Sequence, residues 1–224
     1  MIPIPTPAKE EIDHRTIKLI VGGIAILLPV LTYCLSHEAL TSISESYFEG
    51  DWPRNIFVGF LFAIGALMQG YNGLSKWDMV LSKVASIAAL GIALFPCTCG
   101  RPDVGFNVHY TCATIMFLVL AYFCYRFYRR ATGKAARDKS HTEAKARAWI
   151  YAACGLAISL GLVLLLANAL SKKAISDAHP DVVFWGETIG LVAFGISWLT
   201  ASRVVPGITR ENERFNPLRS TNPP

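Results

Sequence analysis

The sequence contains little charge for its length, and this scarcity restricts its class. Only 17% of the 224 residues are charged, and 53% are hydrophobic, whereas a soluble globular chain is roughly one quarter charged. The few charges lie in short segments that separate long uncharged runs. This pattern excludes a soluble enzyme, a disordered chain and a secreted disulfide scaffold, and the absence of a fixed-period repeat excludes a solenoid. An integral membrane protein remains.

Motifs of the common chemistries are also absent. There is no Walker motif, phosphate-binding glycine loop, haem motif or dinucleotide fingerprint, and no Gly-x-Ser-x-Gly nucleophile elbow. No His-x3-His or Glu-x-x-His pair occurs within a predicted span, so a zinc site would need scattered ligands such as His37, His109, His179 and Glu187. We therefore assign no metal and leave the cofactor unknown.

Six segments are long and apolar enough to cross a bilayer, which takes about 20 residues for about 30 Å of hydrocarbon. Backbone groups in lipid must be satisfied within the segment, so the spans are helices. The predicted fold is an all-α, polytopic membrane bundle with a short N-terminal segment (1–16), a transmembrane domain (17–203) and a disordered tail (204–224). The predicted spans are residues 17–37, 55–75, 79–99, 105–126, 148–170 and 182–202.

The distribution of basic residues predicts the orientation of these spans. Of the 21 Lys and Arg residues, 17 lie in the N-terminal segment, the second and fourth loops and the tail. The positive-inside rule then places both termini in the cytoplasm of a multi-pass inner-membrane protein. Trp52 and Trp185 fall at the outer interface under this topology, and Trp77, Trp149 and Trp198 fall near the inner one.

The fourth loop, between Arg126 and Arg147, is the most basic part of the chain, with eight Lys and Arg residues. A basic segment next to a membrane is attracted to anionic head groups by about 1 kcal/mol per cation. We therefore predict that this loop binds anionic inner-leaflet lipids and not nucleic acid.

The predicted outer side collects the unusual polar residues. Glu187 is the only acid inside a span, about five residues below the outer boundary. A charged group at that depth needs a partner or a wet cavity. Arg54, at the start of the second span, is the partner that depth and sign suggest. The pair either fixes helix packing or forms part of a head-group pocket.

Other candidate site residues lie on the same side. We predict Glu187 and His109 as the acid–base pair and Arg54 as the group that pairs with a lipid phosphate. The Ser-rich loop before the second span alternates with apolar residues, which suggests an extended or re-entrant segment. The remaining substrate-binding candidates are Ser42, Ser44, Tyr47, Tyr110 and Trp185.

Two of the six cysteines, Cys97 and Cys99, also fall on this side. Their one-residue spacing makes a mutual bridge difficult. Cys112 or Cys34 is the alternative partner where geometry allows.

Several of these motifs resemble an uncharacterised family of six-span bacterial membrane proteins, a domain of unknown function. The resemblance covers roughly residues 17–203 and implies the fold and topology but no activity. It is carried by Ser42-Ile-Ser44, Arg54-Asn-Ile-Phe-Val-Gly59, Ala93-Leu-Phe-Pro96, His109-Tyr110, Ala121-Tyr-Phe123, Phe184-Trp-Gly-Glu187 and Phe194-Gly-Ile-Ser-Trp-Leu199. More distantly, the layout is similar to Frag/DRAM/Sfk-type proteins and to ceramidase and adiponectin-receptor-like hydrolases. The latter use zinc and a His-x3-His pair, which this chain lacks.

Two functions fit these observations. The first is a protein that binds or modifies a lipid head group in a polar cavity open to the outer leaflet. As an enzyme, it would be a lipid-directed hydrolase, with or without a metal ion. The alternative is a non-catalytic scaffold, sensor or partner subunit in which the polar cluster is structural. A transporter is less favoured because no span is broken at mid-depth and inverted repeats are not evident.

Overall fold

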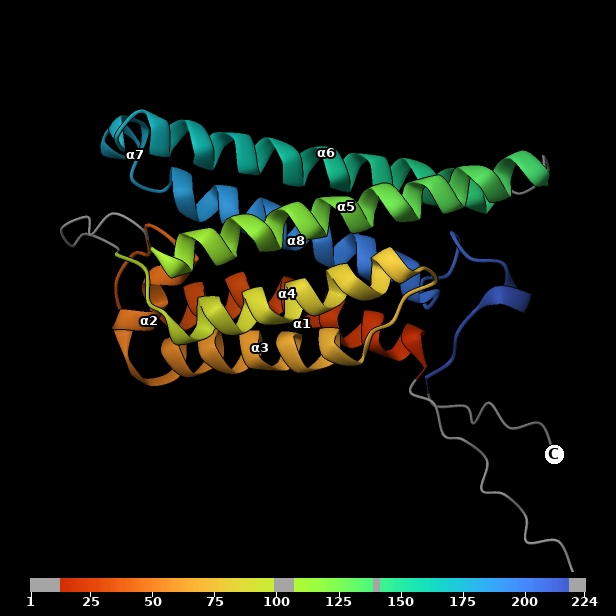
Figure 1. Cartoon of the computed structure of the whole chain (residues 1–224), viewed down its shortest axis with the longest axis horizontal. Helices are drawn as coiled ribbons and strands as arrows, with labels where there is room; N and C mark the ends of the chain where they lie inside the picture. The colour runs from red at the N-terminus through yellow and green to blue at the C-terminus, as the bar shows by residue number, and fades with distance from the viewer. Residues whose placement is uncertain (1–12, 99–106, 139–141, 218–224) are drawn as a thin grey trace, which may run out of the picture.

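The computed structural model describes residues 13–98, 107–138 and 142–217, and within these ranges it contains helices and no strands. Six long helices run along the long axis of the molecule (Figure 1). They are α1 (His14–Leu35), α3 (Asp51–Gly70), α4 (Lys76–Leu94), α5 (Val108–Arg137), α6 (Thr142–Leu170) and α8 (Val182–Ser202). The short elements are η1 (Ile43–Glu45), α2 (Ser46–Glu49), α7 (Ala174–Ala178) and η2 (Glu211–Glu213).

Five of the long helices, α1, α4, α5, α6 and α8, are long and apolar enough to cross a membrane. The chain is therefore a helical bundle of the multi-pass membrane type. Helix α3 has 20 residues but is not among the five, and its first four residues include Asp51 and Arg54. Of the predicted spans, the last coincides with α8, whereas α3 ends five residues before the predicted boundary.

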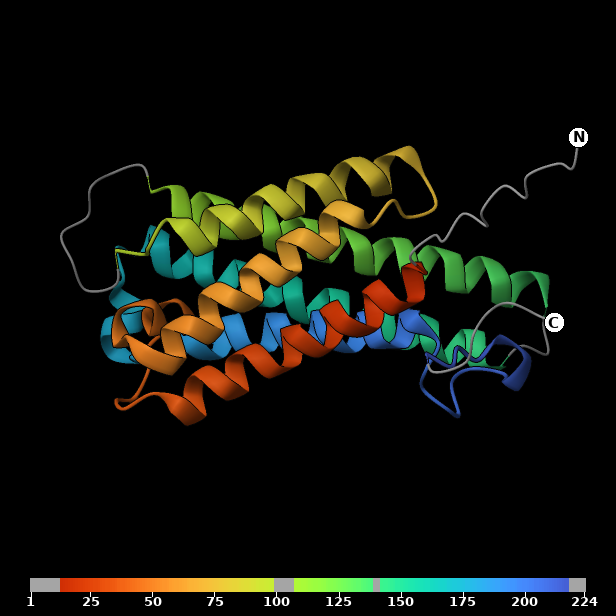
Figure 2. The ribbon, with the colours of Figure 1, turned by 90° about the horizontal axis from the view of Figure 1, so that it is seen from below.

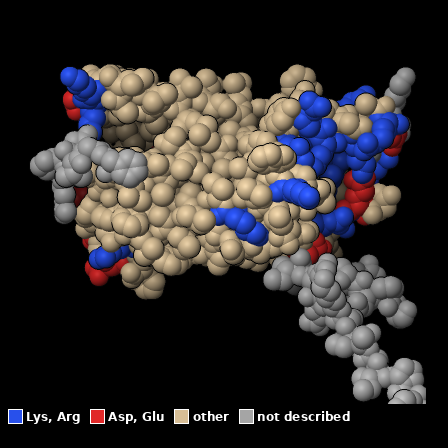
Figure 3. Space-filling view, in the orientation of Figure 1, with Lys and Arg blue, Asp and Glu red and all other residues tan. Residues whose placement is uncertain are grey.

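The two ends of the bundle differ in charge. Figure 3 shows Lys and Arg gathered at one end, where α5 and α6 meet and where the two ends of the described chain lie, beside a long middle with few charges. We call this the basic end. The opposite end, which carries α2, α7 and the start of α8, is called the α7 end (Figure 1).

Most of the predicted fourth loop is helical. Helix α5 continues to Arg137, eleven residues past the predicted end of its span, and α6 begins at Thr142. At 1.5 Å per residue the 30 residues of α5 are about 45 Å long, which exceeds the hydrocarbon thickness. Ala, Lys and Arg are good helix formers, so the change from apolar to basic sequence does not end the helix.

Small residues bring the helix backbones together. A Cβ on Gly195 of α8 would lie 2.7 Å from the carbonyl oxygen of Gly22 in α1, and one on Gly161 of α6 would lie 3.0 Å from that of Gly186 in α8. Helix α8 therefore packs closely between α1 and α6, as the turned view in Figure 2 also shows. Close backbone approach of this kind is how helices associate in lipid.

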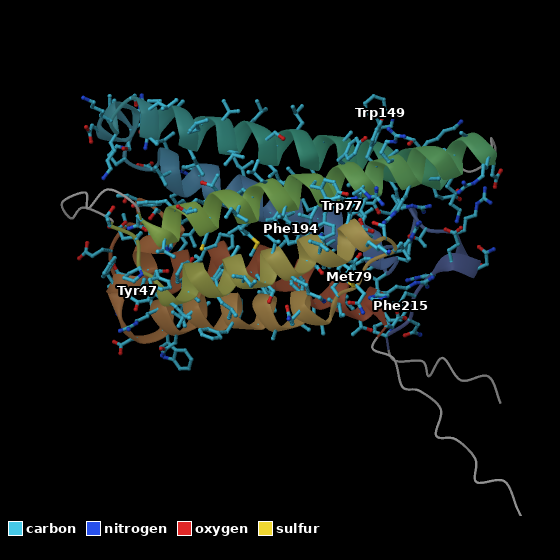
Figure 4. All side chains as sticks on the ribbon, in the orientation of Figure 1. Tyr47, Trp77, Met79, Trp149, Phe194 and Phe215 are labelled. Atoms are coloured by element: carbon cyan, nitrogen blue, oxygen red, sulfur yellow. The ribbon has the colours of Figure 1, made fainter. Side chains whose placement is uncertain are left out.

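Aromatic rings fill the core near the basic end. Trp198 is fully buried, with the rings of Tyr71, Phe123, Phe127 and Phe194 at centroid distances between 5.1 and 6.2 Å. Trp198 faces the other helices and not the bundle surface, so it does not belong to a belt of aromatic rings exposed to lipid head groups. Trp77, Trp149, Trp52 and Trp185 are exposed, and Figure 4 shows Trp77 and Trp149 in the half nearer the basic end.

The C-terminal tail folds back onto the bundle, in contrast to the predicted disorder of residues 204–224. The Phe215 amide donates to the Arg203 carbonyl at 3.0 Å. Glu213 forms ion pairs with Lys134, Arg147 and Arg203. The reason is electrostatic, since the basic end supplies more cations than acids and the tail brings the missing carboxylate. Residues 218–224 lie outside the described part of the chain.

Candidate functional site

The connector between α1 and α3 forms a small structured cap at the α7 end. Ser42 begins η1, and its hydroxyl accepts from the Glu45 amide at 3.1 Å. The Glu45 carboxylate reaches back to the amide and hydroxyl of Thr41, at 2.7 and 2.8 Å. The arrangement is similar to a capping box, with the carboxylate on Thr41 instead of on the amide of the N-cap Ser42, and it explains why the Ser-rich segment turns instead of extending.

Of the three serines of this segment, Ser44 is the one whose hydroxyl contacts a side chain of a long helix in the described contacts. Ser42 is used in the cap, and the Ser46 hydroxyl donates to the Ile43 carbonyl at 2.6 Å. Ser44 lies between them and is directed toward α5 and α8. Within the predicted Ser-rich binding segment, Ser44 thus links the connector to α5 and α8.

Glu187 fixes this connector to α8. Its Oε2 accepts from the Ile43 amide at 2.7 Å, and the amide and hydroxyl of Ser44 interact with the same carboxylate. One turn earlier in α8, the Phe184 amide donates to the Thr41 carbonyl at 2.9 Å. The acid that the sequence singled out therefore has partners, and they come from the connector.

His109 approaches Ser44 from the opposite side. Its Nε2 lies 2.9 Å from the Ser44 Oγ, and its Nδ1 lies 2.8 Å from the Phe95 carbonyl oxygen at the end of α4. A carbonyl only accepts, so Nδ1 carries a proton, and a neutral imidazole accepts at Nε2 from the Ser44 hydroxyl. The ring also stacks on Phe57 and meets the edge of Tyr110.

Ser44 therefore couples two ionisable groups. Its single hydroxyl proton is donated either to Nε2 of His109 or to the Glu187 carboxylate. When Ser44 donates to Glu187, its contact with His109 persists only if Nε2 carries a proton and donates to the Ser44 oxygen. The distance of 2.9 Å is that of a nucleophile and its base, and the Phe95 carbonyl orients the base. Ser44 and His109 are 7% and 1% exposed, so this arrangement is closed.

The other predicted residues surround this cluster without joining it. Arg54 is exposed, and its guanidinium lies 4.7 Å from the centre of the Tyr47 ring. The Tyr110 hydroxyl is 3.0 Å from the Thr98 Oγ1, and Trp185 is exposed beside Phe184.

The predicted pairing of Arg54 with Glu187 is wrong, because within the described part of the chain no ion pair joins them. The position of a residue within its span gives its depth along the helix axis, but not the direction in which its side chain points around that axis. Glu187 faces the connector, whereas Arg54 lies on the exposed side of the first turn of α3.

A fully buried acid was missed by the sequence reasoning. The Asp78 side chain is fully buried in the first turn of α4, where it pairs with Arg126 at 3.2 Å and with Arg130. It also accepts from the Leu74 amide at 3.1 Å. The signal was an acid at the edge of a span facing two arginines spaced one helical turn apart.

The His, Cys, Asp and Glu side chains of the described residues bear on the predicted metal site and disulfide. In ranges 13–98, 107–138 and 142–217, no group of three or more His, Cys, Asp or Glu side chains is placed to hold a metal ion. Cys97 is disulfide-bonded, whereas Cys34 and Cys112, its two alternative partners, are free. Those two alternatives are therefore wrong for Cys97, and Cys99 lies outside the described residues.

No protein-family model, curated protein or solved structure matches this chain.

Proposed function

We propose that this chain crosses the inner membrane six times, with α3 as the sixth span and both termini in the cytoplasm. Two observations support this topology. Lys and Arg concentrate at the end of the bundle where the described chain begins and ends (Figure 3), as the positive-inside rule requires of a cytoplasmic face. The disulfide-bonded Cys97 lies near the opposite end, and disulfides persist in non-cytoplasmic compartments.

The function that this geometry supports best is binding and hydrolysis of a membrane lipid at the α7 end. The observation that carries the proposal is the 2.9 Å contact between the Ser44 Oγ and the His109 Nε2, with His109 held in one tautomer by the Phe95 carbonyl. Nucleophile, base and orienting group are the minimum set for nucleophilic hydrolysis. We also propose that the chain belongs to the six-span family that its motifs resemble and that its substrate is a membrane lipid.

The surroundings suit a lipid head group. Arg54 has no carboxylate partner among the described residues and is steadied by the Tyr47 ring, which leaves the guanidinium free to pair with a phosphate. Trp52 and Trp185 are exposed at the same end. Such rings sit at head-group level in membranes.

The proposed reaction is hydrolysis of a lipid ester. The Ser44 oxygen attacks the ester carbonyl while its proton passes to Nε2 of His109. The C–O bond of the ester breaks, and the departing alcohol takes that proton. Water then attacks the acyl-serine, gives one proton to Nε2, and the acid leaves as the Ser44 hydroxyl is restored. Glu187 positions Ser44 through the connector. Because Ser44 is buried, the connector must move to admit substrate.

A second candidate is a non-catalytic scaffold or partner subunit in which the same cluster is a structural lock. The burial of Ser44 and His109 and the short hydrogen bonds on both favour it. The two functions use Ser44 differently. In a structural lock its hydrogen bonds stabilise the fold, whereas in an enzyme its hydroxyl reacts with the substrate.

The test is Ser44→Ala in the purified full chain, with lipid turnover followed by mass spectrometry in vesicles of bacterial lipids. Ser46→Ala is the matched control, because Ser46 is a buried serine of the same segment that bonds only locally. Turnover lost in the first variant and kept in the second supports the hydrolase. Equal turnover in wild type and Ser44→Ala rejects it, and absence of turnover in wild type favours the structural lock.

A further inference from the structure

A cavity at the basic end is not used by the site described above. Its volume is about 320 Å³, and it opens between the start of α1, the α3–α4 connector, α5 and the end of α8. Ligand pockets begin at about 300 Å³, so the cavity has room for a small ligand. It lies at the opposite end of the bundle from Glu187 and His109.

The lining of this cavity is strongly positive. Arg15, Lys18, Arg130 and Arg203 all contribute to it, against one acid, Asp13, among the described lining residues. The Asp13 carboxylate is already used as the N-cap of α1, where it accepts from the Arg15 amide at 2.8 Å.

Two cations of the lining, Lys18 and Arg15, form no ion pair with a described carboxylate, and Lys18 is the more buried of the two. Arg130 pairs with Asp78, and Arg203 lies 3.5 Å from Glu213. Lys18, in contrast, has no ion pair with any described carboxylate; its Nζ lies 5.5 Å from the centres of both the Tyr71 and Phe127 rings. These rings hold a half-buried ammonium group beside the cavity.

Tyr71 adds a neutral donor to the same wall. It is almost fully buried, and burial raises the pKa of Tyr71 to about 12. The phenol therefore keeps its proton at physiological pH and can donate to an oxygen anion. Guanidinium, ammonium and phenol groups around one cavity are the donors that phosphate oxygens accept from.

We infer that this cavity binds a phosphate group, either as free phosphate or as the head group of a phospholipid, with Lys18 as its central cation. A phosphate group would compensate the charge that Lys18 and Arg15 leave in excess. The inference does not depend on the proposed hydrolase, because the two sites lie at opposite ends of the molecule.

The experiment measures thermal unfolding of the full chain with two probes. In detergent, inorganic phosphate is titrated against equal ionic strength of chloride. In nanodiscs, phosphatidic acid is compared with phosphatidylcholine. Ligand that binds only the folded state raises Tm in proportion to ln(1 + [L]/Kd). Lys18→Met is compared with Lys76→Met, which removes an exposed lysine at the same end.

We expect phosphate or phosphatidic acid to raise the Tm of wild type and of Lys76→Met, with binding at least tenfold weaker in Lys18→Met. A response to inorganic phosphate identifies a free anion as sufficient, and a response to phosphatidic acid alone identifies the lipid as the source. Without either probe, Lys18→Met should raise Tm by about 2 °C, because it removes repulsion among like charges.

Two outcomes would overturn the inference. The first is an equal response of wild type and Lys18→Met to both probes, which would indicate nonspecific binding to the basic end. The second is no response of wild type to either. If Lys18→Met does not fold, Arg15→Gln replaces it, because Arg15 is an exposed lining residue, and the same comparison applies.

Discussion

The Nε2 of His109 lies 2.9 Å from the Oγ of Ser44, although 65 residues separate them in the chain. Ser44 belongs to the connector after α1, and His109 to the first turn of α5. Glu187 of α8 holds the connector from the other side. Three segments that are distant in sequence thus meet at one serine.

Glu187→Gln should lower the free energy of unfolding by about 1–3 kcal/mol. The amide oxygen still accepts from Ile43, but a neutral acceptor forms a weaker bond than a carboxylate. The measurement is thermal or denaturant unfolding in detergent. Arg54→Gln is the control, and we expect it to change stability by less than about 0.5 kcal/mol, since Arg54 is exposed. A larger loss in the control would mean that Arg54 supports the cluster.

Asp78→Asn should be among the most destabilising single changes in the chain. The substitution leaves Arg126 and Arg130 without their buried counterion, and breaking a buried pair costs about 3–5 kcal/mol. The measurement is again unfolding of the purified protein. Asp181→Asn serves as control because Asp181 is exposed and makes no capping bond to α8. Similar stability of the two variants would contradict the prediction.

Gly195→Val should separate α1 from α8. Even the first added carbon would lie 2.5 Å from the Ile26 Cγ1 and 2.7 Å from the Gly22 carbonyl oxygen, so the helices must move apart at a cost of at least about 1–3 kcal/mol. In Gly23→Val, at the residue that follows Gly22 in α1, the added Cβ meets no atom within 4 Å. Detergent stability should therefore fall only in the first variant.

Glu213→Ala should release the C-terminal tail. Glu213 is the common partner of Lys134, Arg147 and Arg203, and its removal leaves a fully buried arginine with fewer acceptors. We expect trypsin to cut after Arg214 faster, by tenfold or more, than in wild type. Glu211→Ala removes an exposed acid of the same turn and should leave the rate unchanged. Equal rates in both variants would show that the tail is held by other contacts.

The proposed topology predicts opposite labelling of the two ends. A single cysteine at Lys172, in the connector between α6 and α7, should react with a membrane-impermeant maleimide added outside intact cells. A single cysteine at Lys76, at the start of α4, should react only after the membrane is opened. Both lysines are exposed. The reverse pattern would place the basic end outside and reject the orientation.

Several features could be predicted from the sequence because they depend on local composition. The bounds of α8 follow from an apolar run between polar residues, and the need of Glu187 for partners follows from its depth in that run. Other features could not. Arg54 has the right depth and charge to pair with Glu187, yet faces another direction. The basic residues after Arg126 read as a loop, but they continue α5 because nothing in them breaks a helix.

The sequence by itself determined that this is a bundle of apolar helices with a strongly basic end, because hydrophobic length and charge distribution are properties of consecutive residues. Only the tertiary structure decided that Ser44, and not Ser42 or Ser46, meets His109, that the tail returns Glu213 to the buried Arg147, and that Lys18 faces a cavity with little opposing charge. These outcomes depend on the rotation of each helix about its own axis and on which segments fold back. Contacts between residues that are distant in the chain determine the rotation of each helix and the segments that fold back, and the order of residues in the sequence does not show these contacts.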